Sequence, residues 1–268
     1  MTQAIQTAPL GRYRVKNVVR SEVAKIATLP STAITLGLTV VASLLVTGLV
    51  SNAALHHAAP YYDGFDPTQQ SLTGLIVAAL TGGVFGALLI TGEYSSGTIR
   101  SSLAATPRRP ILLTAKLGVA AAATVVFCEL LSFVSFFLGQ AILSGGGAPS
   151  ASLGSPGAFR AVTMTGLFIA LFALMAFGFG LIFRSTAAAI AAFVGVVFVL
   201  PLVMRGISQP DLRYVPTNIL TNSIMATVNQ GPGGVVHPLS PAIGLLLMAI
   251  YAAIVLVAGV GLFVKRDA

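Results

Sequence analysis

Charged side chains are scarce in this sequence. Asp, Glu, Lys and Arg together make up 8% of its 268 residues, whereas soluble domains carry roughly 25%. Apolar residues make up 56%. So few charges cannot cover the surface of a large soluble domain, and the composition therefore predicts a membrane protein that crosses the bilayer several times.

Signatures of covalent stabilisation and of catalysis are also missing. The single cysteine, Cys128, lies inside an apolar run, so the sequence gives no intrachain disulfide framework. No H-E-x-x-H motif is present, and Glu129 is the one ionisable residue deep within an apolar run. An intramembrane enzyme would need paired polar catalytic residues in its spans, and the sequence therefore disfavours that class.

Long apolar runs dominate what remains. A transmembrane helix needs about 20 predominantly apolar residues. Six segments satisfy this length, and they predict an all-α membrane protein with spans at residues 33–55, 72–91, 111–143, 159–183, 187–204 and 241–264. The second of these runs holds Gly82 and Gly86, a GxxxG spacing that permits close approach of another helix.

The basic residues fix a predicted orientation, because cytoplasmic loops carry an excess of Lys and Arg. Six spans with both ends in the cytoplasm place most of the basic residues inside: Arg12, Arg14, Lys16, Arg20, Lys25, Arg100, Arg108, Arg109, Lys116, Arg184, Lys265 and Arg266. Only Arg160, Arg205 and Arg213 fall outside. Topology thus accounts for the net charge of +8, and we do not expect binding to nucleic acid.

The first 32 residues differ from the rest. Within residues 12–29, apolar side chains follow helical spacing, while basic side chains occupy other faces of the same helix. This pattern predicts an amphipathic helix in the headgroup layer, with a solvated helix or a plain topology signal as the alternative. We therefore divide the chain into a cytoplasmic segment, residues 1–32, and a six-span domain, residues 33–268.

Two loops on the predicted outer side invite further hypotheses. His56, His57, Asp63 and Asp66 could form a metal site, but their spacing matches no ligand pattern, and we expect no bound metal. Between the last two spans, residues 215–228 combine apolar residues with Asn and Thr. This segment is too short and too polar to span, and it predicts an interfacial or re-entrant helix.

Residues 93–116 form a polar island between the second and third spans. The run reads EYSSGTIRSSLAATPRRPILLTAK and combines an acid, a glycine, a turn and four basic residues. Residues 97–105 can form a short helix, which Pro107 would end. The basic residues place the island on the cytoplasmic face.

This island closely resembles the first cytoplasmic loop of ABC-type-2 transporter permeases. In that family the loop carries a coupling helix that docks on a separate ATPase subunit, and the amphipathic N-terminal helix resembles the family's elbow helix. The resemblance implies docking residues in this chain, namely Glu93, Tyr94, Gly97, Thr98, Arg100, Leu103, Arg108 and Arg109. An ordinary basic loop that obeys the charge rule is the alternative.

The resemblance also implies the partners. The sequence lacks a Gly-Lys dipeptide and hence a P-loop, so ATP and Mg²⁺ would bind a partner ATPase and this chain would hold no cofactor and no catalytic site. The run LSGGG at residues 143–147 looks like the signature of ABC ATPases, but here it predicts only a flexible turn. Two permeases, identical or different, would pair in the bacterial plasma membrane.

The sequence says less about the cargo than about the fold or the partners. The resemblance implies export. Small outer loops and phenylalanine-rich spans favour a hydrophobic or amphipathic small molecule, such as a drug or antibiotic, as the cargo, along a path that includes Glu129, Phe133 and Phe137. The phenylalanines could instead serve only in packing. Glu129 could instead be a structural acid that is hydrogen-bonded to span hydroxyls or paired with Arg160 or Arg205. Three alternatives stay open: the cargo could be a glycan or lipid-linked, the activity could be lipid flipping, or the chain could be a non-transporting assembly or regulatory subunit.

Overall fold

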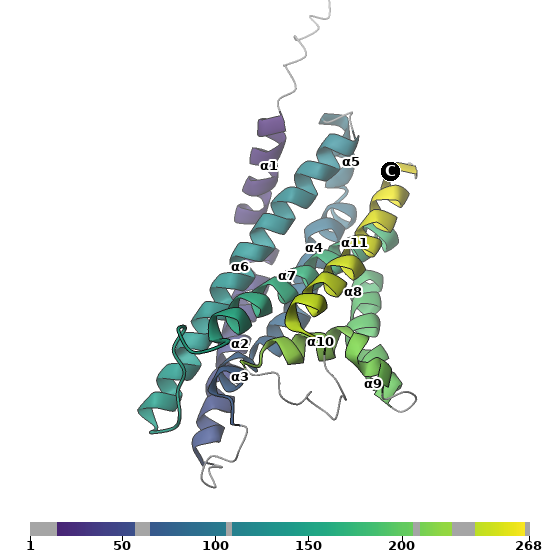
Figure 1. Cartoon of the computed structure of the whole chain (residues 1–268). Helices are drawn as coiled ribbons and strands as arrows, with labels where there is room; N and C mark the ends of the chain where they lie inside the picture. Colours follow the sequence, from purple (N-terminus) through teal and green to yellow (C-terminus); the bar gives the residue numbers. More distant parts are fainter. Residues whose placement is uncertain (1–14, 57–64, 106–108, 206–209, 227–238, 266–268) are drawn as a thin grey trace, which may run out of the picture.

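The computed structural model describes residues 15–56, 65–105, 109–205, 210–226 and 239–265, which form a bundle of helices without a strand (Figure 1). Within these ranges, six helical segments are long and apolar enough to span a membrane: Pro30–His56, Pro67–Ser95, Pro110–Gly145, Ala158–Phe183, Thr186–Met204 and Pro241–Lys265. The predicted all-α architecture with six helices of spanning length is therefore confirmed.

The N-terminal helices α1 (Val15–Thr28) and α2 (Pro30–His56) are separated only by Leu29. The break lies where a proline disfavours helical geometry in the residue before it. Val18 of α1 is buried against Leu112 and Ala115, so α1 packs on the third span. Residues 12–14 of the predicted amphipathic helix lie outside the described residues, and its position relative to the headgroup layer stays a prediction.

The second span is longer than the predicted residues 72–91. It consists of α3 (Pro67–Leu72) and α4 (Leu75–Ser95), with a short irregularity between them. Asp66 starts α3, because its Oδ1 accepts hydrogen bonds from the backbone N–H groups of Thr68 (2.9 Å) and Gln69 (3.2 Å). The α3 sequence PTQQSL is polar, which is why hydropathy alone did not reveal it.

The centre of the bundle is α7 (Ala158–Phe183), the most buried of the six spans. It packs against α4, against α6 (Arg109–Gly145) and against α11 (Pro241–Lys265). The ends of α6, α7 and α11 differ from the predicted ends by at most two residues. Phenylalanines of α7 fill the core, as the packing alternative predicts, with Phe168, Phe172 and Phe177 buried.

The fifth span is not a uniform α-helix. After α8 (Thr186–Val194), residues Gly195–Val199 form a π-helical turn, η1, and α9 (Leu200–Arg205) completes the span. The short helix predicted at residues 215–228 is present as α10 (Pro216–Ser223), preceded by the 3-10 turn η2 (Pro210–Tyr214). This helix ends at Ser223, before the predicted end at 228, and residues 227 and 228 lie outside the described residues.

The segment after α10 is tied to the rest of the bundle by two polar side chains. Asp66 Oδ2 accepts a hydrogen bond from the Ala226 N–H at 2.7 Å. Arg160 donates from Nη2 to the carbonyls of Met225 and Ala226, both at 2.9 Å. Arg160 therefore binds backbone carbonyls, and the structure gives no support to the predicted pairing of Arg160 with Glu129.

The GxxxG spacing of α4 does permit a close helix approach. A Cβ atom added at Gly86 would lie 1.9 Å from the carbonyl oxygen of Ala173 in α7. At Gly82 the nearest atom would be a side-chain carbon of Ile169, at 3.2 Å. Backbone cannot move aside as a side chain can, so Gly86 is the glycine on which the packing of α4 against α7 depends.

We therefore expect Gly86→Ala to lower the free energy of unfolding by about 1–3 kcal/mol through overpacking. Gly92→Ala, in the same helix, is the matched control, because a Cβ atom there would meet nothing within 4 Å. The measurement is the stability of each variant in detergent micelles. Equal stability of the two variants would show that the helices can separate without cost.

Candidate functional site

The polar island folds into a turn followed by a short helix, α5 (Thr98–Ala105). Gly97 adopts φ +71°, a backbone conformation that other L-residues rarely adopt, and this turn separates α5 from α4. Ile99 anchors α5, because its side chain is buried in a cluster with Leu113 of α6 and Phe263 of α11. The short helix predicted at residues 97–105 is thus confirmed to within one residue.

The predicted docking residues fall into different environments. Gly97, Thr98 and Arg100 are exposed, as a docking surface requires. Tyr94 is only partly exposed, and the guanidinium of Arg184 lies 5.6 Å from its ring centre. Arg108 lies outside the described residues. For Leu103 and Arg109 the structure describes the helical backbone but not the side chain.

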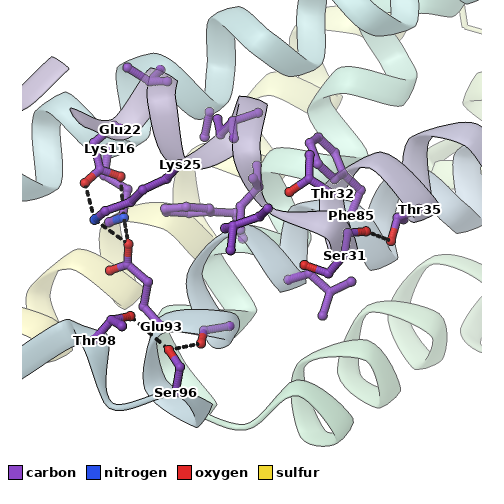
Figure 2. A pocket seen from close by; sticks show the side chains of 18 of the residues that line it. Glu22, Lys25, Ser31, Thr32, Thr35, Phe85, Glu93, Ser96, Thr98 and Lys116 are labelled. Carbon is purple, nitrogen blue, oxygen red and sulfur yellow. Dashed lines mark hydrogen bonds and ion pairs between the residues drawn. The ribbon is translucent and has the colours of Figure 1, made fainter. Parts of the chain in front are cut away.

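Glu93 does not belong to the exposed surface. It is 7% exposed and joins Glu22, Lys25 and Lys116 in a group that we call the charge ring (Figure 2). Lys25 Nζ contacts Glu22 Oε1 and Glu93 Oε1, both at 2.8 Å. Lys116 Nζ contacts Glu22 Oε2 at 2.5 Å and Glu93 Oε1 at 2.6 Å.

The charge ring joins helices that are distant in sequence. Glu22 and Lys25 come from α1, Glu93 from the end of α4, and Lys116 from α6. Lys25 Nζ also donates to Ser102 Oγ at 3.2 Å, which brings α5 into the same network. The ring therefore fixes the α4–α5 junction relative to both the N-terminal helix and the third span.

The charge ring has no net charge, because it contains two carboxylates and two ammonium groups. Removing such groups from water is costly unless they are paired and hydrogen-bonded, and here each lysine contacts both glutamates. Burial lowers the pKa of Lys25, but its hydrogen bonds to Glu22 and Glu93 and their negative charges outweigh burial and raise that pKa. Lys25 therefore stays protonated at neutral pH.

Sequence reasoning missed this ring. It treated Lys25 and Lys116 as topology signals and did not consider Glu22, although Glu22 is the only acid in a basic segment and lies three residues before Lys25. Acids are rare in this chain, with seven Asp and Glu in all, so each one near a span was a signal worth pairing with a neighbouring base.

The three residues of the predicted cargo path all lie on α6. Glu129 packs against α7, where a Cβ atom added to Gly166 would lie 2.7 Å from the Glu129 Cδ atom. Phe133 contacts Phe159, with ring centres 6.4 Å apart, and Phe137 is 54% exposed on the outside of α6. Their role in a cargo path stays a prediction.

No cluster of three or more His, Cys, Asp or Glu residues suited to a metal occurs among the residues that the structure describes. Of the outer-loop candidates, His56 ends α2 and Asp66 caps α3. His57 and Asp63 lie outside the described residues.

Comparison with known proteins identifies a family but no activity. A search of curated proteins found no match. A family described as "Protein of unknown function (DUF2705)" matches residues 57–268, which cover all the spans except the first and include Glu93, α5 and Lys116. Since the match extends over most of the chain, the protein belongs to the DUF2705 family.

Proposed function

We propose that this protein is the membrane permease subunit of an ATP-driven exporter of the ABC type, working with a separate ATPase subunit. The observation that carries the proposal is the short helix α5, which is exposed at the end of the bundle, lies between the second and third spans, and is anchored to them by Ile99 and the charge ring. A helix so placed can receive a push from a soluble partner and pass it to the spans.

The contacts at that end support such transmission. Movement of α5 would pull on Glu93 at the end of α4, because only Ser96 and Gly97 lie between α4 and α5. Glu93 is held by Lys116 of α6 and Lys25 of α1, so α1, α4 and α6 would move together. ATP binding by two ATPase subunits would in this way tilt helices in two paired permeases.

The distribution of charge supports a cytoplasmic position for this end. Arg100 lies in α5, Lys116 in the first part of α6, Arg184 directly after α7 and Lys265 at the last residue of α11. The start of α6, α1, α5 and the end of α11 lie at the same end of the bundle (Figure 1). Under the positive-inside rule this end faces the cytoplasm of the bacterial plasma membrane. The exposed Arg100 would meet acidic groups of the ATPase or anionic headgroups.

The cargo that fits the surface of the spans best is a hydrophobic or amphipathic small molecule. The exposed side chains of the spans are apolar, for example Leu38, Leu130 and Phe137, so cargo at the surface between two copies would meet an apolar wall. Glu129 would offer one polar contact to it. A regulatory subunit without transport is the rival function, and the exposed α5 serves it equally well.

The test is assembly with an ATPase. The full chain, expressed with an ATPase that carries Walker motifs and is encoded beside it, should copurify from detergent-solubilised membranes and change the rate of ATP hydrolysis when hydrophobic cargo is added. An ATPase of unrelated family is the control. If the encoded ATPase neither copurifies nor responds to the chain, the proposed function is wrong.

A further inference from the structure

A cavity of about 440 Å³ lies beside the charge ring, between α1, α2, α4 and α6, and is shown in Figure 2. Cavities that hold small molecules generally measure about 300–1,000 Å³. This one is formed by a single chain and lies away from Glu129, Phe133 and Phe137, none of which lines it. It is thus a candidate site separate from the proposed cargo path.

One wall of the cavity is apolar. Phe85 and Leu88 of α4, Val119 of α6 and Phe177 of α7 form part of it, with Ile26 of α1 nearby. Phe85 and Phe177 are buried, so they present a fixed surface rather than mobile side chains. This wall suits an alkyl chain or a small apolar ring.

The other wall is polar but carries no net charge. The charge ring contributes two acids and two bases, and the hydroxyl groups of Ser96 and Thr98 lie on the same side of the cavity, whereas Thr35 lies on the opposite side (Figure 2). Because the four charges already pair with one another, an ionic ligand would have to break a pair or leave its own charge uncompensated. A neutral head avoids that cost.

Lys116 supplies a specific contact for such a head. An ammonium carries three donors, and the carboxylates of Glu22 and Glu93 accept two of them. Lys116 is 5% exposed and lines the cavity, so a ligand inside the cavity, rather than bulk water, is placed to use the remaining donor. A hydroxyl or carbonyl oxygen of a ligand would accept it.

We propose that this cavity binds a neutral amphipathic molecule, with a hydroxyl-bearing head at the charge ring and a single alkyl chain against the wall formed by Phe85, Leu88 and Phe177. The site goes beyond the proposed function, because it lies within one chain and needs no ATPase. Its binding can therefore be measured whether or not the protein transports anything.

Fluorescence offers a direct test, because the sequence contains no tryptophan. Leu29→Trp introduces a single reporter at the cavity of the full chain in phospholipid nanodiscs, because Leu29 lines the cavity, is exposed and lies outside the apolar wall that would hold the alkyl chain. The probe is a monoacylglycerol with a brominated chain, which quenches nearby tryptophan. Leu202→Trp is the control reporter, because Leu202 is exposed on α9 and is not part of the cavity wall, so it reports only the probe dissolved in lipid.

We expect saturable quenching in the Leu29→Trp variant and gradual, non-saturating quenching in the Leu202→Trp variant. Adding Gly92→Leu should raise the half-quenching concentration at least about tenfold, which corresponds to about 1.4 kcal/mol. Gly92 lines the cavity, and a Cβ atom there meets nothing within 4 Å, so the new side chain fills the cavity without a clash in its first carbon.

Gly118→Leu is the matched control for Gly92→Leu, because Gly118 is exposed on α6, is also open to a Cβ atom and lies outside the cavity wall. It should leave the half-quenching concentration unchanged. Equal, non-saturating quenching at both reporters, or no effect of Gly92→Leu, would overturn the site. Tighter binding of a brominated alkylammonium than of the monoacylglycerol would overturn the assignment of a neutral head.

Discussion

Lys116→Met should lower the free energy of unfolding by about 3–5 kcal/mol, the range for breaking a buried ion pair by removing one partner. Lys116 contacts both acids of the charge ring and is 5% exposed. Its loss leaves Glu22 and Glu93 buried with Lys25 as the one remaining base of the charge ring. Methionine keeps most of the volume of the lysine side chain, so the effect isolates the charge.

Two comparisons separate the charge from packing. Lys16→Met removes a lysine from an exposed position of α1 and should change the stability by less than about 0.5 kcal/mol. Replacing the whole ring, with Glu22→Gln, Lys25→Met, Glu93→Gln and Lys116→Met together, should be less harmful than Lys116→Met alone, since no uncompensated charge remains. Thermal unfolding in detergent measures all three. If the single and fourfold variants are equally unstable, the ring contributes through packing rather than through charge balance.

Ser101→Pro should abolish the response of ATP hydrolysis to cargo in the assembled complex while leaving the chain in the membrane. Ser101 is exposed in the interior of α5, where proline removes a backbone hydrogen bond and clashes with the preceding turn. The cost is about 3 kcal/mol or more, which an eight-residue helix cannot absorb. The measurement is the ATPase rate with and without cargo.

The position of the proline matters. The first residue of α5 is Thr98, and a helix tolerates proline at its first position, so Thr98→Pro should have the smaller effect. Ser101→Ala, which keeps the helix, is the matched control and should respond to cargo like the parent chain. An unchanged response in Ser101→Pro would argue against α5 as the coupling element.

The sequence predicted the parts of this fold that depend on local composition. Apolar runs located the six spans, the glycine and proline around residues 97–107 located α5, and the spacing of Gly82 and Gly86 indicated a helix contact that the structure confirms at Gly86. Each of these signals lies within a few consecutive residues, where one physical cause dominates.

The missed features depend on contacts between distant segments or on polar residues inside helices. Glu22 and Lys116 are 94 residues apart, and no local pattern links them. The polar helix α3 depends on the Asp66 cap and packing against α6, which outweigh its low hydropathy. Glu93 was predicted to be a docking residue because its run resembles the coupling loop of ABC-type-2 permeases, whereas its side chain is buried against the lysines.

ATP-driven movement of cargo is the most direct test of the proposed permease. Inside-out vesicles would carry the chain together with its encoded ATPase and would receive a fluorescent hydrophobic cargo, ATP and Mg²⁺. We predict accumulation of cargo in the vesicles that stops when the Walker lysine of the ATPase is replaced. Continued ATP hydrolysis with no accumulation of any hydrophobic cargo tested would contradict export and favour a regulatory subunit.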